Sequence, residues 1–175
     1  MRVPVAEAAL DLERRGLLTR DSKDHSERII EHVGSLLGRD LPPDLIAFYR
    51  ERVATLGAFY AQVPEWNDWV GWRSPSSIVT ALLHAEAVPV FDDGCGNLYG
   101  LDLTACVETP AVYFFDHESG FKEPEWAAGS SLGAFMLLLA DKDRAYTEGW
   151  PPQWELKVDP DLERCPRAPA IWNAG

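Results

Sequence analysis

The feature of the sequence that most constrains the fold is residues 87–121, which read as three short strands separated by acidic turns. The runs at 88–91, 98–103 and 111–115 are rich in β-branched and aromatic residues, which favour strands. Between the first two runs lies Asp-Asp-Gly-Cys-Gly-Asn, residues 92–97. Because aspartate, asparagine and glycine are typical of tight turns, these two runs predict a β-hairpin.

Alternation within the second run predicts one core face. The larger side chains, at Tyr99, Leu101 and Leu103, fall on one face of a strand, and the other face ends in Asp102. The third run, residues 111–115, is apolar on both faces, which is typical of a central strand that is covered on both sides. We therefore expect these strands to form the middle of a sheet.

Five segments with apolar residues at helical spacing surround the strands. They are residues 5–18, 24–37, 43–56, 74–83 and 131–139. Gly38 and Gly57 follow the second and third segments as C-terminal stops, and Ser130 or Ser131 can cap the fifth. The pattern predicts an α+β fold, in which one antiparallel or mixed sheet of about four to six strands packs against helices.

The length of 175 residues favours a single domain that can fold unaided. We expect a helical N-terminal extension at 1–23, the main α+β domain at 24–146 and an irregular C-terminal tail at 147–175. The tail is rich in proline, and we expect it to pack on the domain. Its expected anchors are Trp150, Trp154 and Trp172.

The formal net charge of −12 is unevenly distributed along the chain. Residues 1–89 carry 10 basic and 13 acidic side chains, whereas residues 90–175 carry 6 and 15. An acidic field repels nucleic acid and anionic membrane surfaces and favours encounter with basic partners. We expect no nucleic-acid or membrane binding, although acidity of this degree is also what a solvated surface shows.

Cysteine and histidine spacing argues against a metal or disulfide framework. The three cysteines, at positions 95, 106 and 165, are odd in number and show no metal-ligand spacing, and the four histidines are scattered. No apolar run approaches the ~18 residues of a membrane-spanning helix. We expect reduced thiols, a cytoplasmic location, and neither a metal nor a cofactor.

Two clusters have both a structural and a functional interpretation. Asp116, His117 and Glu118 follow the third strand and offer the carboxylates that acid–base or metal chemistry requires, so a metal-dependent hydrolase stays open as an alternative. The tryptophans of residues 58–73, Trp66 and Trp69 among them, suit either a cap on the core or a partner-binding patch. Asp92 and Asp93 are typical of side chains that bond their own turn.

An ordered set of short motifs resembles the SUKH superfamily. A helix opened by Leu-Pro-Pro-Asp at 41–44 precedes a strand that leads to the acidic Gly-x-Gly turn at 92–96. A strand ending in Leu-Asp follows, then a Val-Tyr strand ending in Asp-His-Glu at 116–118, and a serine-capped apolar helix at 130–139. The resemblance covers residues 28–141, whereas the tryptophan segment, the first helix and the tail lie outside the pattern.

The resemblance implies an antiparallel sheet backed by helices, of the kind in the yeast Smi/Knr cell-wall synthesis regulator. It implies protein binding rather than catalysis, and many bacterial members look like immunity proteins that block a toxin, often a nuclease. The expected partner is therefore a basic toxin domain, with the chain itself a monomer or weak dimer. A regulatory interaction module without a toxin is the alternative. The expected contacts are Asp92, Asp93, Asp116, Glu118, Trp66 and Trp69.

Overall fold

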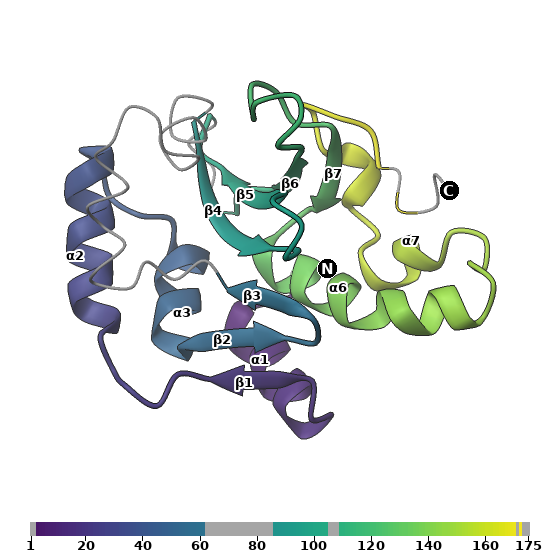
Figure 1. The fold of residues 1–175 in the computed structure, drawn as a ribbon, viewed down its shortest axis with the longest axis horizontal. Coiled ribbons are helices and arrows are strands. Elements are labelled where there is room, and N and C mark those ends of the chain that lie inside the picture. The colour runs from purple at the N-terminus through teal and green to yellow at the C-terminus, as the bar shows by residue number, and fades with distance from the viewer. Residues whose placement is uncertain (1–2, 62–85, 105–108, 171, 173–175) are drawn as a thin grey trace.

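The computed structural model describes residues 3–61, 86–104, 109–170 and 172. These residues form one seven-stranded sheet backed by helices (Figure 1). The strands follow one another in sequence order, and every neighbouring pair is antiparallel. The α+β prediction with an antiparallel sheet is confirmed, although the strand count exceeds the predicted range.

The predicted hairpin and central strand form the middle of this sheet. In the hairpin, Phe91 pairs with Tyr99, and Asp92 pairs with Leu98 across the turn. The third predicted strand lies between two neighbours, so it is an interior strand as expected. The seven strands are β1 Leu18–Arg20, β2 Val53–Leu56, β3 Phe59–Ala61, β4 Ala87–Asp92, β5 Leu98–Asp102, β6 Val112–Phe115 and β7 Trp126–Gly129.

Four strands of the sheet were not predicted, and one of them, β2, lies where a helix was expected to continue. Helix α3 (Pro43–Glu51) ends at Arg52, which has a left-handed φ of 52°, and β2 follows at once. Gly57 is therefore not a helix stop but part of the turn between β2 and β3. Helix α1 (Val5–Arg14) likewise ends before Gly16, whose φ is 69°, and the chain then enters β1.

Two predicted helix ends are confirmed. Helix α2 (Ser26–Leu37) stops at Gly38, which takes the left-handed conformation with φ 62°. Helix α6 (Leu132–Thr147) begins after Ser131, whose Oγ accepts a hydrogen bond from the Ala134 N–H at 3.2 Å. Each of these helix ends depends on one residue at that end, which is why the sequence alone predicted both.

The tail is more ordered than its proline content predicted. It contains a short helix, α7 (Trp154–Val158), and a 3-10 turn, η1 (Leu162–Arg164), so the expectation of an irregular tail was wrong for those residues. Trp154 and Trp172 are buried as expected of anchors. The third expected anchor, Trp150, is 36% exposed, and its ring contacts those of Trp154 and the exposed Tyr146.

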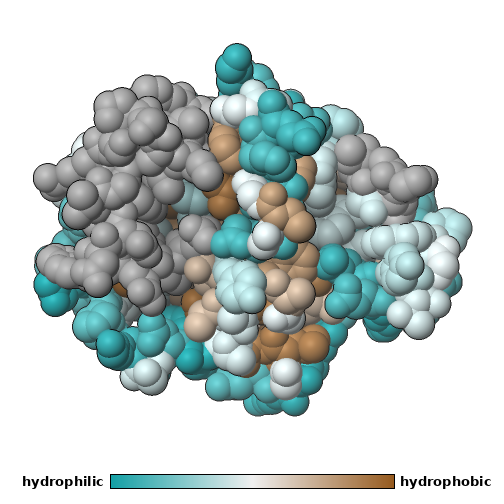
Figure 2. All heavy atoms as spheres, in the orientation of Figure 1, coloured by the Kyte–Doolittle hydropathy of each residue, from teal (hydrophilic) through white to brown (hydrophobic). Residues whose placement is uncertain are grey.

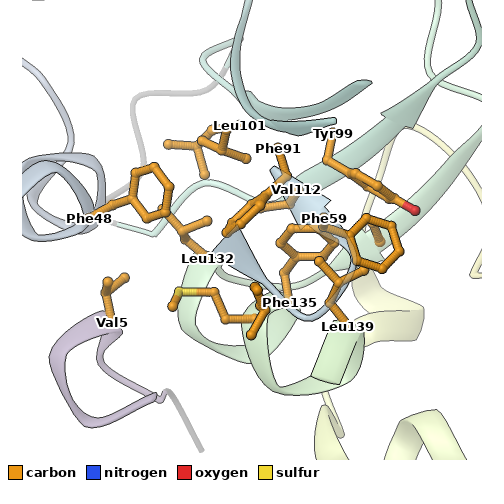
Figure 3. Close-up of a cluster of buried hydrophobic side chains, with 14 of the residues drawn as sticks. Val5, Phe48, Phe59, Phe91, Tyr99, Leu101, Val112, Leu132, Phe135 and Leu139 are labelled. Atoms are coloured by element: carbon orange, nitrogen blue, oxygen red, sulfur yellow. The ribbon is translucent and has the colours of Figure 1, made fainter. Parts of the chain in front are cut away.

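The core lies between the sheet and helices α1, α3 and α6 (Figure 3). The Phe91 ring lies 5.4 Å from that of Phe48 on α3 and 5.8 Å from that of Phe135 on α6. Helix α1 contributes Val5 and Leu12, both buried, to the same core. The boundaries proposed at residues 23 and 146 remain predictions.

The opposite face of β5 is also buried, which corrects the prediction of a single core face. All five residues of β5 are buried, and Asp102 is only 6% exposed. On the same face of the neighbouring strand β6, Tyr113 and Phe115 are fully buried. The Arg167 Nη1 donates to the Asp102 Oδ1 at 3.0 Å, so a residue of the tail covers the polar end of this face.

Replacing Tyr49 with phenylalanine is expected to raise the free energy of unfolding by about 1 kcal/mol. The Tyr49 side chain is buried, and among the described residues its hydroxyl has no hydrogen-bond partner. Burial raises the pKa of Tyr49 well above its usual value. An unpaired buried hydroxyl costs about 1–3 kcal/mol, and phenylalanine removes that cost without changing the ring.

The matched control for this prediction is Tyr113→Phe. The Tyr113 hydroxyl accepts a hydrogen bond from the Arg167 N–H at 3.3 Å, so the same substitution should there lower stability by about 1 kcal/mol. Urea unfolding of both variants measures the two changes. A loss of stability in Tyr49→Phe would show that its hydroxyl is satisfied in solution.

Candidate functional site

The turn between β4 and β5 is held together by the two aspartates predicted to bond their own backbone. Asp93 Oδ1 accepts hydrogen bonds from the N–H groups of Cys95 at 2.8 Å and Asn97 at 3.2 Å. Its Oδ2 accepts from the Asn97 side-chain amide at 2.8 Å. Asp92 Oδ1 accepts from the Gly94 N–H at 2.8 Å. Both carboxylates are therefore structural, and both remain partly exposed.

The turn after β6 is built in the same way. The Asp116 Oδ1 accepts a hydrogen bond from the Glu118 N–H at 2.8 Å, and the Ser119 hydroxyl donates to the Asp116 carbonyl at 2.9 Å. The Gly120 N–H donates to the His117 carbonyl at 3.1 Å. This leaves His117 and Glu118 exposed at the tip of the turn.

One asparagine joins the two turns. Asn97 Oδ1 accepts a hydrogen bond from the His117 N–H at 3.2 Å and lies 2.8 Å from the His117 Nδ1. The imidazole also packs on Gly96, because a Cβ at that position would lie 3.5 Å from the His117 Cγ. The carboxylates of Asp92 and Asp93 thus share one end of the sheet with the acidic turn after β6. We name this end the acidic edge, comprising Asp92, Asp93, Asp116 and Glu118.

His117 lies within the acidic edge and is close to one of its carboxylates. The His117 Nδ1 lies 3.5 Å from the Asp116 Oδ1. Beneath the hairpin, burial raises the pKa of the Tyr99 hydroxyl, and the negative charge of Asp93 raises it further. The acidic edge therefore concentrates negative charge at one end of the sheet, and such a field attracts cationic groups.

The other two expected contacts, Trp66 and Trp69, lie outside the described residues, as does the helix predicted at 74–83. The two turns thus bring together the acidic part of the predicted site. Contact between these acidic residues and a partner remains a prediction.

The geometry gives no support to the hydrolase alternative. In the described part of the chain, no group of three or more histidine, cysteine, aspartate or glutamate side chains could hold a metal ion. His117 directs Nδ1 at Asn97, and Asp116 directs Oδ1 at its own turn. These side chains shape the turns instead of converging on a common point.

Sequence reasoning missed Tyr60 of β3, which adjoins the acidic edge. Its side chain is 57% exposed and lies in register with Asp92. A Cβ added to Gly94 would lie 4.0 Å from the Tyr60 Cε2, so the ring reaches the hairpin turn. The alternation of Phe59, which is buried, with Tyr60, which is exposed, could have identified Tyr60 as a surface residue. That interpretation required β3 to be recognised as a strand.

None of the helices in the described ranges is long and apolar enough to cross a membrane. This finding agrees with the absence of long apolar runs in the sequence.

Comparison with known proteins gives one match. Residues 25–136 match the sequence model of the SMI1 / KNR4 family (SUKH-1), which is more than half of the 175-residue chain. No curated protein and no solved structure matches the chain. The matched region includes both turns of the acidic edge and the start of α6. The chain belongs to the SMI1 / KNR4 family (SUKH-1).

Proposed function

We propose that this protein is a non-catalytic binding protein, an immunity protein that neutralises a basic, nuclease-type toxin in the cytoplasm. The proposal rests above all on the acidic edge, because Asn97 joins two turns from separate hairpins into one negatively charged surface. A nuclease presents a basic groove to its substrate, and an acidic surface can occupy that groove and exclude nucleic acid. Membership of the SMI1 / KNR4 family supports a binding role.

Charge at the acidic edge can be removed without losing the turns. Asparagine retains one carbonyl oxygen for the backbone hydrogen bonds, and in Asp93→Asn only the bond from the Asn97 side-chain amide is lost, so Asp92→Asn and Asp93→Asn should preserve the hairpin. Charge reversal with lysine would instead break the contacts that hold Cys95 and Asn97. Among the contacts of the described residues, Glu118 contributes its N–H to the turn, so Glu118→Gln changes charge alone.

The triple variant Asp92→Asn/Asp93→Asn/Glu118→Gln is expected to weaken the partner complex by about tenfold. The partner is first captured from the native host at low salt, identified by mass spectrometry and purified. Its affinity for each variant is then measured by calorimetry at low and high salt. The loss should shrink at high salt, because screening already weakens the wild-type complex.

The matched control carries the same change of charge elsewhere. Glu7→Gln, Asp143→Asn and Glu163→Gln remove three exposed carboxylates outside the acidic edge. If this control loses as much affinity as the triple variant, net charge rather than the acidic edge determines binding. Equal affinity of all three proteins would remove the surface from the proposal.

The inhibitory role is tested in living cells. Cells that express the captured partner alone should stop growing, and co-expression of this protein should restore growth. The triple variant should restore growth less well than the control variant. A captured partner that is harmless when expressed alone would contradict the immunity role.

A further inference from the structure

A row of side chains crosses the sheet beside the acidic edge. The register pairs Thr19 with Thr55, Thr55 with Tyr60, and Tyr60 with Asp92. Residues directly opposite one another on neighbouring strands point to the same side of a sheet, so these four side chains share one face. The Thr19 and Thr55 hydroxyls lie 2.7 Å apart, which confirms the shared direction at one end of the row.

This row faces away from the core. The residues that alternate with it, Leu18, Leu56 and Phe59, are buried against the helices. Thr19 is exposed, and Tyr60 is 57% exposed. Figure 2 shows pale and brown surface over β2 and β3, between more hydrophilic areas.

In the described part of the chain, carboxylates border Tyr60. Asp92 is its cross-strand neighbour, and Asp93 follows in the same turn. The cation of β1, Arg20, is held by Glu51 at 2.6 Å and Glu13 at 3.1 Å, so its charge is balanced within this chain. An aromatic face bordered by carboxylates complements a guanidinium, which stacks on the ring while donating to the oxygens.

We infer that the outer face of β1–β3 is a docking surface on which Tyr60 receives an arginine side chain of a basic protein partner. The inference rests on the proposed function, and it assigns Tyr60 as the aromatic anchor next to the acidic edge. Tyrosine and arginine are among the residues that dominate binding energy at interfaces. Thr55 and Thr19 continue this face of the sheet from Tyr60 toward β1.

The test compares two cationic probes that differ in shape at equal charge. Hexa-arginine and hexa-lysine peptides are titrated into the full-length protein at low ionic strength, with calorimetry for affinity and NMR for the contacted residues. The wild-type protein should bind hexa-arginine more tightly than hexa-lysine, and the amides of Tyr60 and Thr55 should shift. A stacked guanidinium at an exposed site corresponds to about a two- to fivefold difference in affinity.

The decisive variant is Tyr60→Thr, because threonine suits an exposed strand and lacks the ring. It should lower the affinity for hexa-arginine by about threefold and abolish the preference over hexa-lysine. The matched control is Tyr146→Thr, which removes a ring that is 71% exposed on α6. This control should leave both affinities and the preference unchanged, and thermal melts should show that both variants are folded.

The outcomes separate this inference from the proposed function. If Tyr60→Thr changes neither affinity, or if Tyr146→Thr has the same effect, the docking surface is overturned. If the triple variant Asp92→Asn/Asp93→Asn/Glu118→Gln still lowers the affinity for both peptides, the acidic edge binds cationic groups without help from Tyr60. A wild-type protein that binds neither peptide, or that shows no preference for hexa-arginine, also overturns the arginine-specific role of Tyr60.

Discussion

Replacing Gly129 with alanine is expected to lower the free energy of unfolding by about 3 kcal/mol. Gly129 is the last residue of β7, and the chain turns there directly into α6. A Cβ at this position would lie 2.6 Å from the Cβ of Phe135 and 2.8 Å from its Cα. Because backbone atoms of the helix are involved, rotating one side chain cannot relieve the overlap, and α6 must shift away from the sheet.

The displaced residue makes this cost large. Phe135 contacts the rings of Phe91 at 5.8 Å and Tyr99 at 4.8 Å, so its movement disturbs the centre of the core. For a domain of this length, a loss of about 3 kcal/mol corresponds to a decrease of roughly 6 to 12 °C in melting temperature. Calorimetry or circular dichroism measures the decrease directly.

Gly34→Ala is the matched control, because the same methyl group should there have the opposite effect. Gly34 lies inside α2, and a Cβ would meet the Arg39 carbonyl oxygen at an ordinary 3.6 Å. Alanine in a helix interior is about 1 kcal/mol more favourable than glycine. Gly34→Ala should therefore raise the melting temperature. Stabilisation by Gly129→Ala would show that β7 and α6 are not packed this closely in solution.

The centre of the fold was predictable because its signals are local. The Asp-Asp-Gly-Cys-Gly-Asn turn needs glycine at two positions of positive φ, with 73° at Gly94 and 100° at Gly96. Its aspartates bond backbone groups within four residues of themselves. Such a turn forms from its own residues, so the sequence specified the hairpin without knowledge of the rest of the chain.

Strands β1, β2 and β3 were not predictable in the same way. β1 and β3 have three residues each, and such short strands are stable only when paired with neighbours. β2 directly follows a helix, and the helical pattern of α3 obscured its start at Val53. Tyr60 was missed for the same reason, because an exposed tyrosine becomes informative only once its strand and register are known.

The two acidic turns were predictable from the sequence, but the way they come together was not. Each acidic turn could be located from its own sequence, whereas the contact between Asn97 and His117 joins residues twenty positions apart. The burial of the second face of β5 depends on a longer separation, since Arg167 follows Asp102 by 65 residues. Nothing near Asp102 in the sequence indicates that a tail residue will cover it.

Removing the Asp102 carboxylate is expected to lower the free energy of unfolding by about 3 kcal/mol. The Asp102 side chain is 8% exposed and pairs with Arg167, whose side chain is 20% exposed. The Asp102 Oδ1 also accepts from the N–H of Thr104 at 3.0 Å and from its hydroxyl at 2.8 Å. In Asp102→Ala, the guanidinium stays partly buried over the Tyr113 ring without this carboxylate.

A double-mutant cycle isolates the interaction between the two side chains. Arg167→Ala leaves the buried carboxylate without its guanidinium, and it should lower stability by a similar amount. The double variant Asp102→Ala/Arg167→Ala leaves neither charge behind, so it should lose about 1–2 kcal/mol less than the sum of the single variants. Urea unfolding of the four proteins gives the coupling free energy.

The exposed pair of η1 is the matched control for this cycle. The Arg164 Nη1 lies 2.6 Å from the Asp161 Oδ1, but the two side chains are 82% and 39% exposed. Water screens such a pair, so the same cycle there should give a coupling below about 1 kcal/mol. If the Asp102–Arg167 cycle were equally weak, the tail would not be held on the sheet by this contact. A strong coupling would instead make the tail a structural part of the sheet's second face, and shortening the chain before Arg167 should then destabilise the whole domain.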